Sequence, residues 1–217
     1  MPLDSLRIEA RGVGGSLQGT GEILGSFEDW TSFSLRTSMV EPAEASLELG
    51  DDTGWTRLNA MLQLGSEFQV FLGDRPQMRG RVEAIDSTGD AAQSATQRIV
   101  LRTKLSDALF SSAPQGIRLR NATLKQFVLA CYSSLGLTEA DFDFRGDVSR
   151  DLLTGARGKG AKAPVDIDSL SKQDAKVNPP ETIYSAVDRH LRRHGMLHWD
   201  GADGRIVILL NIGSFAL

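Results

Sequence analysis

The segment from Pro179 to Leu210 contains the clearest start and stop signals for secondary structure in the chain, and these signals strongly restrict its local fold. Its two leading prolines cannot continue a helix from upstream, so they predict a helix that begins at about Glu181. An apolar stripe follows at four-residue spacing, on Ile183, Val187 and Leu191. Gly195 then ends the helix. The pattern predicts an amphipathic helix with one buried face.

Two short segments after this helix, Met196 to Trp199 and Arg205 to Leu210, have the composition of β-strands. The residues between them are of the kind that forms tight turns, namely Asp200, Gly201, Asp203 and Gly204. This arrangement predicts a β-hairpin closed by glycine-rich turn chemistry. Helix and hairpin together form a small packing unit rather than a motif for chemistry.

The length and composition of the chain allow one or two hydrophobic cores. It has 217 residues, of which 41% are hydrophobic and 24% charged, which excludes disordered and fibrous classes. We expect two modest domains, at residues 1–104 and 105–217. The formal net charge of -4 gives no reason to expect a surface for specific nucleic-acid binding.

The single cysteine, Cys131, excludes an internal disulfide and fits a protein assembled in the cytosol. It lies on the apolar face of a predicted helix, so we interpret it as a small core residue rather than a reactive thiol. The N-terminal sequence lacks the pattern of a signal peptide, and no apolar run is long enough to cross a bilayer. We therefore expect neither export by a signal peptide nor stable membrane insertion.

The first half of the chain alternates apolar and polar residues, as half-buried antiparallel strands do. The clearest of these strands are predicted at 31–37, 45–49, 67–72, 77–85 and 97–103. Helical spacing between Trp55 and Leu62 predicts one short helix among them. About six strands and one helix are enough to close a barrel. The expected fold class is α+β and β-rich, with an antiparallel tube-like β-barrel followed by a small α/β domain.

The second half changes to helical periodicity. Leu105 to Phe110 predicts a helical turn, and Thr123 with Gln126 forms a capping-box pair ahead of an apolar face that ends at Gly136. Periodicity is then lost over about 145–178, which we interpret as a long loop or arm. Loops of this length are usually functional or ordered by a partner.

The three histidines His190, His194 and His198 are the strongest suggestion of a metal site, because the first two are spaced to share one helical face. Yet no glutamate stands between them in the HExxH arrangement, and Gly195 breaks the helix before the third. Capping and surface roles for these imidazoles are favoured over metal binding. We predict no metal site.

The Gly155 to Lys162 segment, GARGKGAK, combines glycine with lysine as phosphate loops do. Its spacing is wrong, no Ser or Thr follows the lysine, and no strand–loop–helix context surrounds it, so a mobile basic arm is favoured. The sequence contains no nucleophile elbow either. We therefore predict no catalytic residues and no cofactor.

Four stretches together resemble the baseplate hub proteins of phage tails: FEDWTSFSLRTSM, SEFQVFLGDRPQMRGRVEAID, QRIVLRTKLSDALFSSAP and PPETIYSAVDRHLRRHGMLHWDGADGRIVIL. The likeness is to the Mu-type tail protein P family, within a wider group that contains the late-control protein D of P2-like phages and the spike base of type VI secretion. Phe68 to Ile85 resembles the strand pair of the family's first tube-like barrel. Glu181 with Thr182 matches its helix start, and Gly195 its helix break.

The resemblance implies a structural virion protein without catalysis, assembled in the host cytoplasm and located in the tail tip or baseplate. It implies a homotrimeric ring that contacts the tail tube or a distal tail protein, the tail spike, the tape measure protein and other baseplate proteins, with DNA passing through the channel. Arg157, Lys159 and Lys162 in the arm are the candidate partner-binding residues.

One departure from the family concerns a second barrel, which many hub proteins carry. Only seven residues follow Leu210, so a second barrel would lie in another polypeptide, or the chain is a shortened hub, or its assembly differs. Two other functions stay open from the sequence. One is a peptidoglycan-binding or lytic tail-tip component, because a helix followed by a hairpin also suits such folds. The other is a metal-dependent enzyme using His190 and His194.

Overall fold

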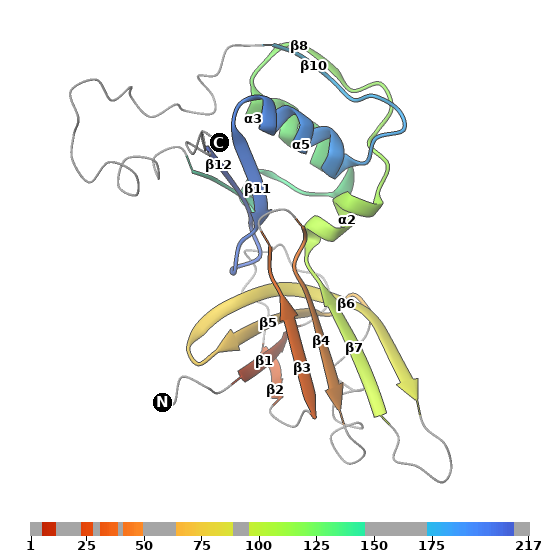
Figure 1. Ribbon diagram of the computed structural model, residues 1–217, viewed down its shortest axis with the longest axis vertical. Helices are drawn as coiled ribbons and strands as arrows, with labels where there is room; N and C mark the ends of the chain where they lie inside the picture. Colours follow the sequence, from red (N-terminus) through yellow and green to blue (C-terminus); the bar gives the residue numbers. More distant parts are fainter. Residues whose placement is uncertain are drawn as a thin grey trace, which may run out of the picture. The chain divides into compact units, whose positions relative to one another are not determined.

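The computed structural model of the chain describes residues 6–11, 23–27, 31–38, 41–49, 64–88, 96–145 and 173–210. The chain divides into two compact units (Figure 1). The first, the sheet unit, comprises residues 1–106 and 200–205, and the second, the mixed unit, comprises residues 107–199 and 206–217. The turn of the C-terminal hairpin thus belongs to the unit built by the first half of the chain.

The sheet unit contains one curled antiparallel sheet of seven strands (Figure 1). In chain order the strands are β1 (Leu6–Arg11), β2 (Ile23–Phe27), β3 (Ser32–Arg36), β4 (Glu44–Leu49), β5 (Glu67–Leu72), β6 (Arg75–Thr88) and β7 (Thr96–Arg102). Their spatial order is β2-β1-β5-β6-β7-β4-β3. Register shifts in β5 and β6 add the local bending that lets a sheet curl. β2 and β3 are the two edge strands of the described sheet.

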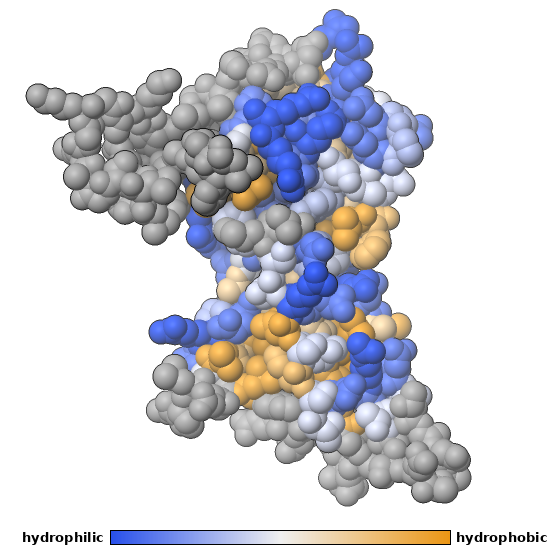
Figure 2. Space-filling model, in the orientation of Figure 1, coloured by the Kyte–Doolittle hydropathy of each residue, from blue (hydrophilic) through white to orange (hydrophobic). Residues whose placement is uncertain are grey.

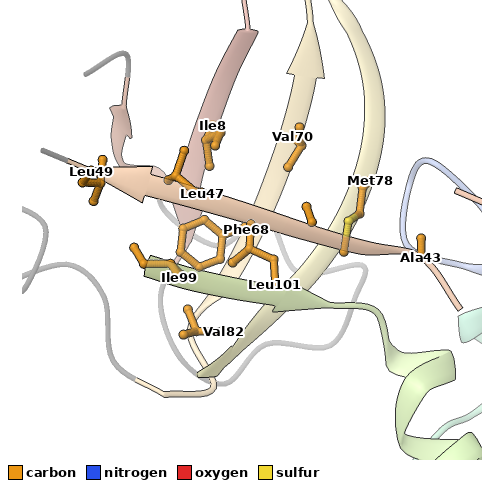
Figure 3. Close-up of a cluster of buried hydrophobic side chains, with 11 residues drawn as sticks. Ile8, Ala43, Leu47, Leu49, Phe68, Val70, Met78, Val82, Ile99 and Leu101 are labelled. Atoms are coloured by element: carbon orange, nitrogen blue, oxygen red, sulfur yellow. The ribbon is translucent and has the colours of Figure 1, made fainter. Parts of the chain in front are cut away.

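The core of the sheet unit lies on one face of this sheet, because alternate residues of a strand point to the same side. β4 shows the pattern directly: Ala45, Leu47 and Leu49 are buried, while the residues between them are half-buried. The same buried cluster contains side chains from β1, β5, β6 and β7 (Figure 3), namely Ile8, Phe68, Val70, Met78, Val82, Ile99 and Leu101.

Gly80 of β6 lies against the backbone of β7. A Cβ atom placed on it would lie 2.4 Å from the carbonyl oxygen of Arg102 and 2.9 Å from its carbonyl carbon. Both atoms belong to the backbone of β7, so they cannot move aside as a flexible side chain does. Glycine is therefore the residue that lets β6 and β7 pair at this point.

The mixed unit combines short helices with two small sheets. Its helices are α2 (Lys104–Phe110), which begins in the sheet unit, α3 (Leu124–Tyr132), α5 (Ile183–Arg193) and the 3-10 helices η1 (Ser133–Leu135) and η2 (Glu139–Asp141). Strands β8 (Arg118–Ala122) and β10 (Gln173–Lys176) pair antiparallel. The other sheet has the order β11-β12-β9, from β9 (Phe142–Arg145), β11 (Met196–Asp200) and β12 (Ile206–Leu210).

Local sequence signals explain the helix ends. Thr123 and Gln126 form the expected capping box at the start of α3, and Gly136 ends the following turn with φ 73°. Thr182 caps α5 by accepting a hydrogen bond from the Ser185 N–H. The helix therefore begins two residues later than expected from Glu181.

The β-rich α+β class is confirmed, and so are the capped helix α3, the hairpin of β11 and β12 and the five clearest strands. The expectation that the arm runs to residue 178 is wrong at its end, because 173–176 form β10 against β8. The expected helix between Trp55 and Leu62 lies outside the described residues. None of the helices in the described ranges is both long and apolar enough to cross a membrane.

Candidate functional site: an edge strand and a hydrogen-bonded turn

β3 is the edge strand whose side chains can be described in full. Ser32, Ser34 and Arg36 are exposed, whereas Phe33 and Leu35 are half-buried and pack against the core. Apolar surface gathers over the sheet unit in Figure 2, in the region where Figure 1 places this sheet. The edge strand therefore has two partly exposed apolar side chains, Phe33 and Leu35, beside the backbone that faces away from β4.

The polar side of β3 is tied to β4 by short side chains. Ser32 donates a hydrogen bond to the Glu48 carboxylate at 2.9 Å, and the Ser34 and Ser46 hydroxyls lie 3.0 Å apart. Arg36 is the strand's one charged residue, and it pairs with Glu41. Edge strands that avoid association usually carry proline or several charges, so the middle of β3 lacks this protection.

Asp200, the last residue of β11, accepts hydrogen bonds from three residues of the sheet unit. Its Oδ2 accepts a hydrogen bond from the Ala43 N–H at 2.8 Å and another from the Thr103 hydroxyl at 2.7 Å. The backbone N–H of Leu105, in the first turn of α2, also donates to this carboxyl group. Burial raises the pKa of Asp200 to about 6, although these three hydrogen bonds act in the opposite direction.

The rest of the turn lies against β5 and β6. The Gln69 side chain donates to the Ala202 carbonyl at 2.9 Å. Gly204, with φ 86°, is so close to Arg79 that an added Cβ would lie 2.8 Å from the arginine Cβ. The turn is closed by a hydrogen bond from the Gly201 N–H to the Arg205 carbonyl at 2.7 Å. The sequence identified these residues as a turn, but nothing in it pointed to their partners.

A second polar cluster stabilises the mixed unit around Glu181. Its two carboxylate oxygens accept hydrogen bonds from Arg189 Nε at 2.7 Å and from a terminal guanidinium nitrogen at 2.9 Å. The Asn178 N–H donates to the same carboxylate at 2.8 Å. These hydrogen bonds lower the pKa of Glu181. Cys131 is buried in the same unit, and burial raises the pKa of its thiol to about 12, as suits a core residue.

Replacing Glu181 by alanine is expected to destabilise the mixed unit by about 1–3 kcal/mol, because a bidentate charged pair and a backbone cap are lost together. Urea unfolding at neutral pH measures the change. Glu139→Ala is the control, since that side chain is 65% exposed and its ion pair is with Lys125. Equal losses in the two variants would contradict the assignment.

The histidines occupy different environments. His194 is the C-cap of α5, and capping is one of the two roles predicted for the histidines. The other predicted role, at the surface, is wrong for His190 and His198, because both are buried. His190 is buried, with its ring 4.4 Å from that of Phe127 and its Nε2 3.2 Å from the Lys176 carbonyl. His198 is also buried, with its ring 4.5 Å from that of Tyr184 and tilted by 38°, because β11 turns it into the interior of the unit.

Within the described part of the chain, neither nitrogen of His198 has a hydrogen-bond partner, and its nearest acidic atom is an Asp188 carboxylate oxygen 3.8 Å from Nδ1. Burial, with a smaller contribution from Arg192, lowers the pKa of His198 to about 4. In the described ranges, no three or more His, Cys, Asp or Glu side chains gather closely enough to hold a metal ion. Arg157, Lys159 and Lys162 lie outside the described residues.

No protein-family model and no curated protein matches the sequence. The fold does match solved structures. The 43 kDa tail protein of prophage MuSo2 from Shewanella oneidensis matches 94% of this chain and 53% of its own, with TM-score 0.63 and 18% identity. A tail protein from Neisseria meningitidis MC58 matches 94% of this chain and 50% of its own, with TM-score 0.59 and 15% identity.

A component of the E. coli type VI secretion system matches more weakly, with TM-score 0.47 and 9% identity over 96% of this chain and 46% of its own. The fold is similar to that of the two tail proteins. Its structural neighbours include Mu-type tail proteins, which is the family that the sequence resembles. The chain spans about half the length of the two tail proteins.

Proposed function

We propose that this chain is a structural component of a phage tail, and more specifically a baseplate hub protein at the distal end of the tail tube. In this role it forms a ring, as a homotrimer, that connects the tube, the spike and the surrounding baseplate proteins. The observation that carries the proposal is the fold, which matches two tail proteins over 94% of the chain. The proposal includes no catalytic role.

The topology of the sheet supports assembly through its edges. Every neighbouring pair of the seven strands is antiparallel, so β2 and β3 at the two ends of the order run in the same direction. Parallel pairing of these two strands would have to be connected by residues 28–31 alone, whereas such connections take about a dozen residues or more. In the proposed ring, a closed tube therefore results from pairing between subunits.

Light scattering and electron microscopy of the purified full chain test the hub role. A ring is expected, and tagged protein is expected at the tips of tails assembled with it. A chain that stays monomeric at all concentrations and never joins tail tips would contradict the proposal.

The predicted domains 1–104 and 105–217 remain a prediction.

A lysine at Ser34 is expected to weaken the ring by at least tenfold in the dissociation constant, because a charge in the middle of an edge strand opposes pairing with a neighbour. Ser46→Lys is the matched control, since Ser46 is the cross-strand partner of Ser34 on the interior strand β4. Analytical ultracentrifugation compares the two variants. If both weaken the ring equally, the edge strand is not the contact.

The arm is proposed to bind a neighbouring protein through Arg157, Lys159 and Lys162, which remains a prediction from the sequence. Deletion of residues 157–171 is expected to leave a folded chain that no longer enters tails. Normal incorporation of the deletion variant, measured by immunoblotting of purified tails, would show that the arm does not contribute.

A further inference from the structure

The turn Asp200 to Arg205 is hydrogen-bonded to Ala43, Thr103 and Gln69 of the sheet unit. We propose that the Asp200 carboxylate pins the end of the β3–β4 hairpin, so that the assembly edge keeps its conformation only while the C-terminal turn is bound in its site. The proposal rests on the proposed function in one respect, namely that β3 is the edge that a second copy contacts.

The pin joins parts of the chain that are far apart in sequence. Ala43 directly precedes β4, Thr103 directly follows β7, and Asp200 accepts hydrogen bonds from both through a single oxygen. β4 and β7 are paired neighbours whose ends meet here, since Glu44 lies opposite Arg102. One carboxylate thus holds the ends of two adjacent strands in register.

The site directs several hydrogen-bond donors at the carboxyl group of Asp200. It offers two backbone N–H groups and one hydroxyl, from Ala43, Leu105 and Thr103, all directed at the same group. Donors of this kind, when buried, lose free energy if they are left without an acceptor. Gln69 and the close packing of Gly204 on Arg79 fix the turn from β5 and β6. The turn is therefore held both at the ends of β4 and β7 and by residues of β5 and β6.

The edge strand depends on this pin because of its position. Among the described strands, β3 pairs only with β4. Residues 37–43 connect the two strands, so Ala43 is the last residue of the connection, and its N–H is fixed by Asp200. The residues flanking the turn belong to the mixed unit. If the β11–β12 hairpin leaves the sheet unit, the Asp200 carboxylate leaves its site with it.

Hydrogen–deuterium exchange of the full chain tests the pin. Asp200→Ala is expected to raise exchange in residues 31–49 by about tenfold or more, since three hydrogen bonds to buried donors are lost. β8, α3 and α5 of the mixed unit are expected to keep their protection. Asp203→Ala is the matched control, because this exposed carboxylate of the same turn accepts its hydrogen bonds from Arg205. It is expected to leave residues 31–49 unchanged.

Thr103→Val is a milder variant that removes one donor, and it keeps the test decisive if Asp200→Ala unfolds the whole sheet unit. It is expected to give a smaller increase in the same residues. Unchanged protection of residues 31–49 in both variants would overturn the pin. An equal increase in exchange throughout the sheet unit in Thr103→Val would also overturn it.

Light scattering on the same samples separates this test from that of the hub role. A wild-type chain that is always monomeric contradicts ring assembly, while the exchange data still decide whether Asp200 holds the edge. An Asp200→Ala variant that forms normal rings with normal exchange overturns the pin alone.

Discussion

Replacing Gly80 by alanine is expected to destabilise the sheet unit by about 3 kcal/mol, because the new methyl group would overlap the β7 backbone. The nearest atom, the Arg102 carbonyl oxygen, would be only 2.4 Å from the Cβ. Relief of this overlap requires β6 and β7 to separate locally. Separation breaks hydrogen bonds in the centre of the strand order, so the effect should spread to β4 and β5.

Gly65→Ala is the control for this experiment. Gly65 has φ 85°, and no atom of the described chain lies within 4 Å of the place that a Cβ would take, so alanine there costs only the strain of a left-handed backbone, about 1 kcal/mol. Urea unfolding compares the two variants in the same unit. Equal losses would mean that backbone conformation, rather than steric overlap, decides both positions.

Acidification from pH 7 to pH 4 is expected to act on the two units in opposite directions. Asp200 in the sheet unit has a pKa raised from 3.8 to about 6, and His198 in the mixed unit has a pKa lowered from 6.5 to about 4. Both shifts result chiefly from burial, which favours the neutral form of each group. A neutral carboxyl carries a proton and a neutral imidazole has lost one, so the same cause gives opposite pH dependence.

The signs follow from proton linkage. The folded sheet unit binds the Asp200 proton more tightly than the unfolded chain does. Its contribution is therefore fully present below pH 3.8 and is lost as the pH rises through about 6. The folded mixed unit excludes the His198 proton, so its contribution is present above pH 6.5 and is lost as the pH falls through about 4. Each shift corresponds to about 3 kcal/mol.

Urea unfolding followed by NMR amide signals of each unit measures these slopes at several pH values. Asp200→Asn is expected to flatten the slope of the sheet unit, and His198→Phe that of the mixed unit, apart from a smaller part due to His190, whose pKa is also lowered. If the units unfold together, the two substitutions should still change the common slope in opposite directions. Changes of the same sign would contradict the assignment.

Much of the fold could be predicted from short-range pattern. Strands such as β4 and β5 could be predicted because apolar and polar residues alternate along them, whatever strands lie beside them. Helix α3 could be predicted because Thr123 and Gln126 form a capping box at its start. β9 and β10 were missed for the opposite reason. Each is four residues long and is stabilised by pairing with a strand far along the chain, β12 in one case and β8 in the other.

The candidate site was less accessible to sequence reasoning. The turn around Asp200 was recognised, but its partners Ala43 and Thr103 are 157 and 97 residues away. The histidines were given capping and surface roles, whereas alternation along β11 places His198 inside. The edge role of β3 follows from strand order, which local periodicity does not reveal.

The assignment of Asp200 to Arg205 to the sheet unit also affects the order of events during synthesis. Domains usually fold from the N-terminus as the chain leaves the ribosome. A nascent chain that has not yet reached Asp200 has all seven strands but lacks the acceptor for Ala43 and Thr103. The sheet therefore gains these hydrogen bonds only after most of the mixed unit has been translated, so its strands are synthesised well before the last of its contacts can form.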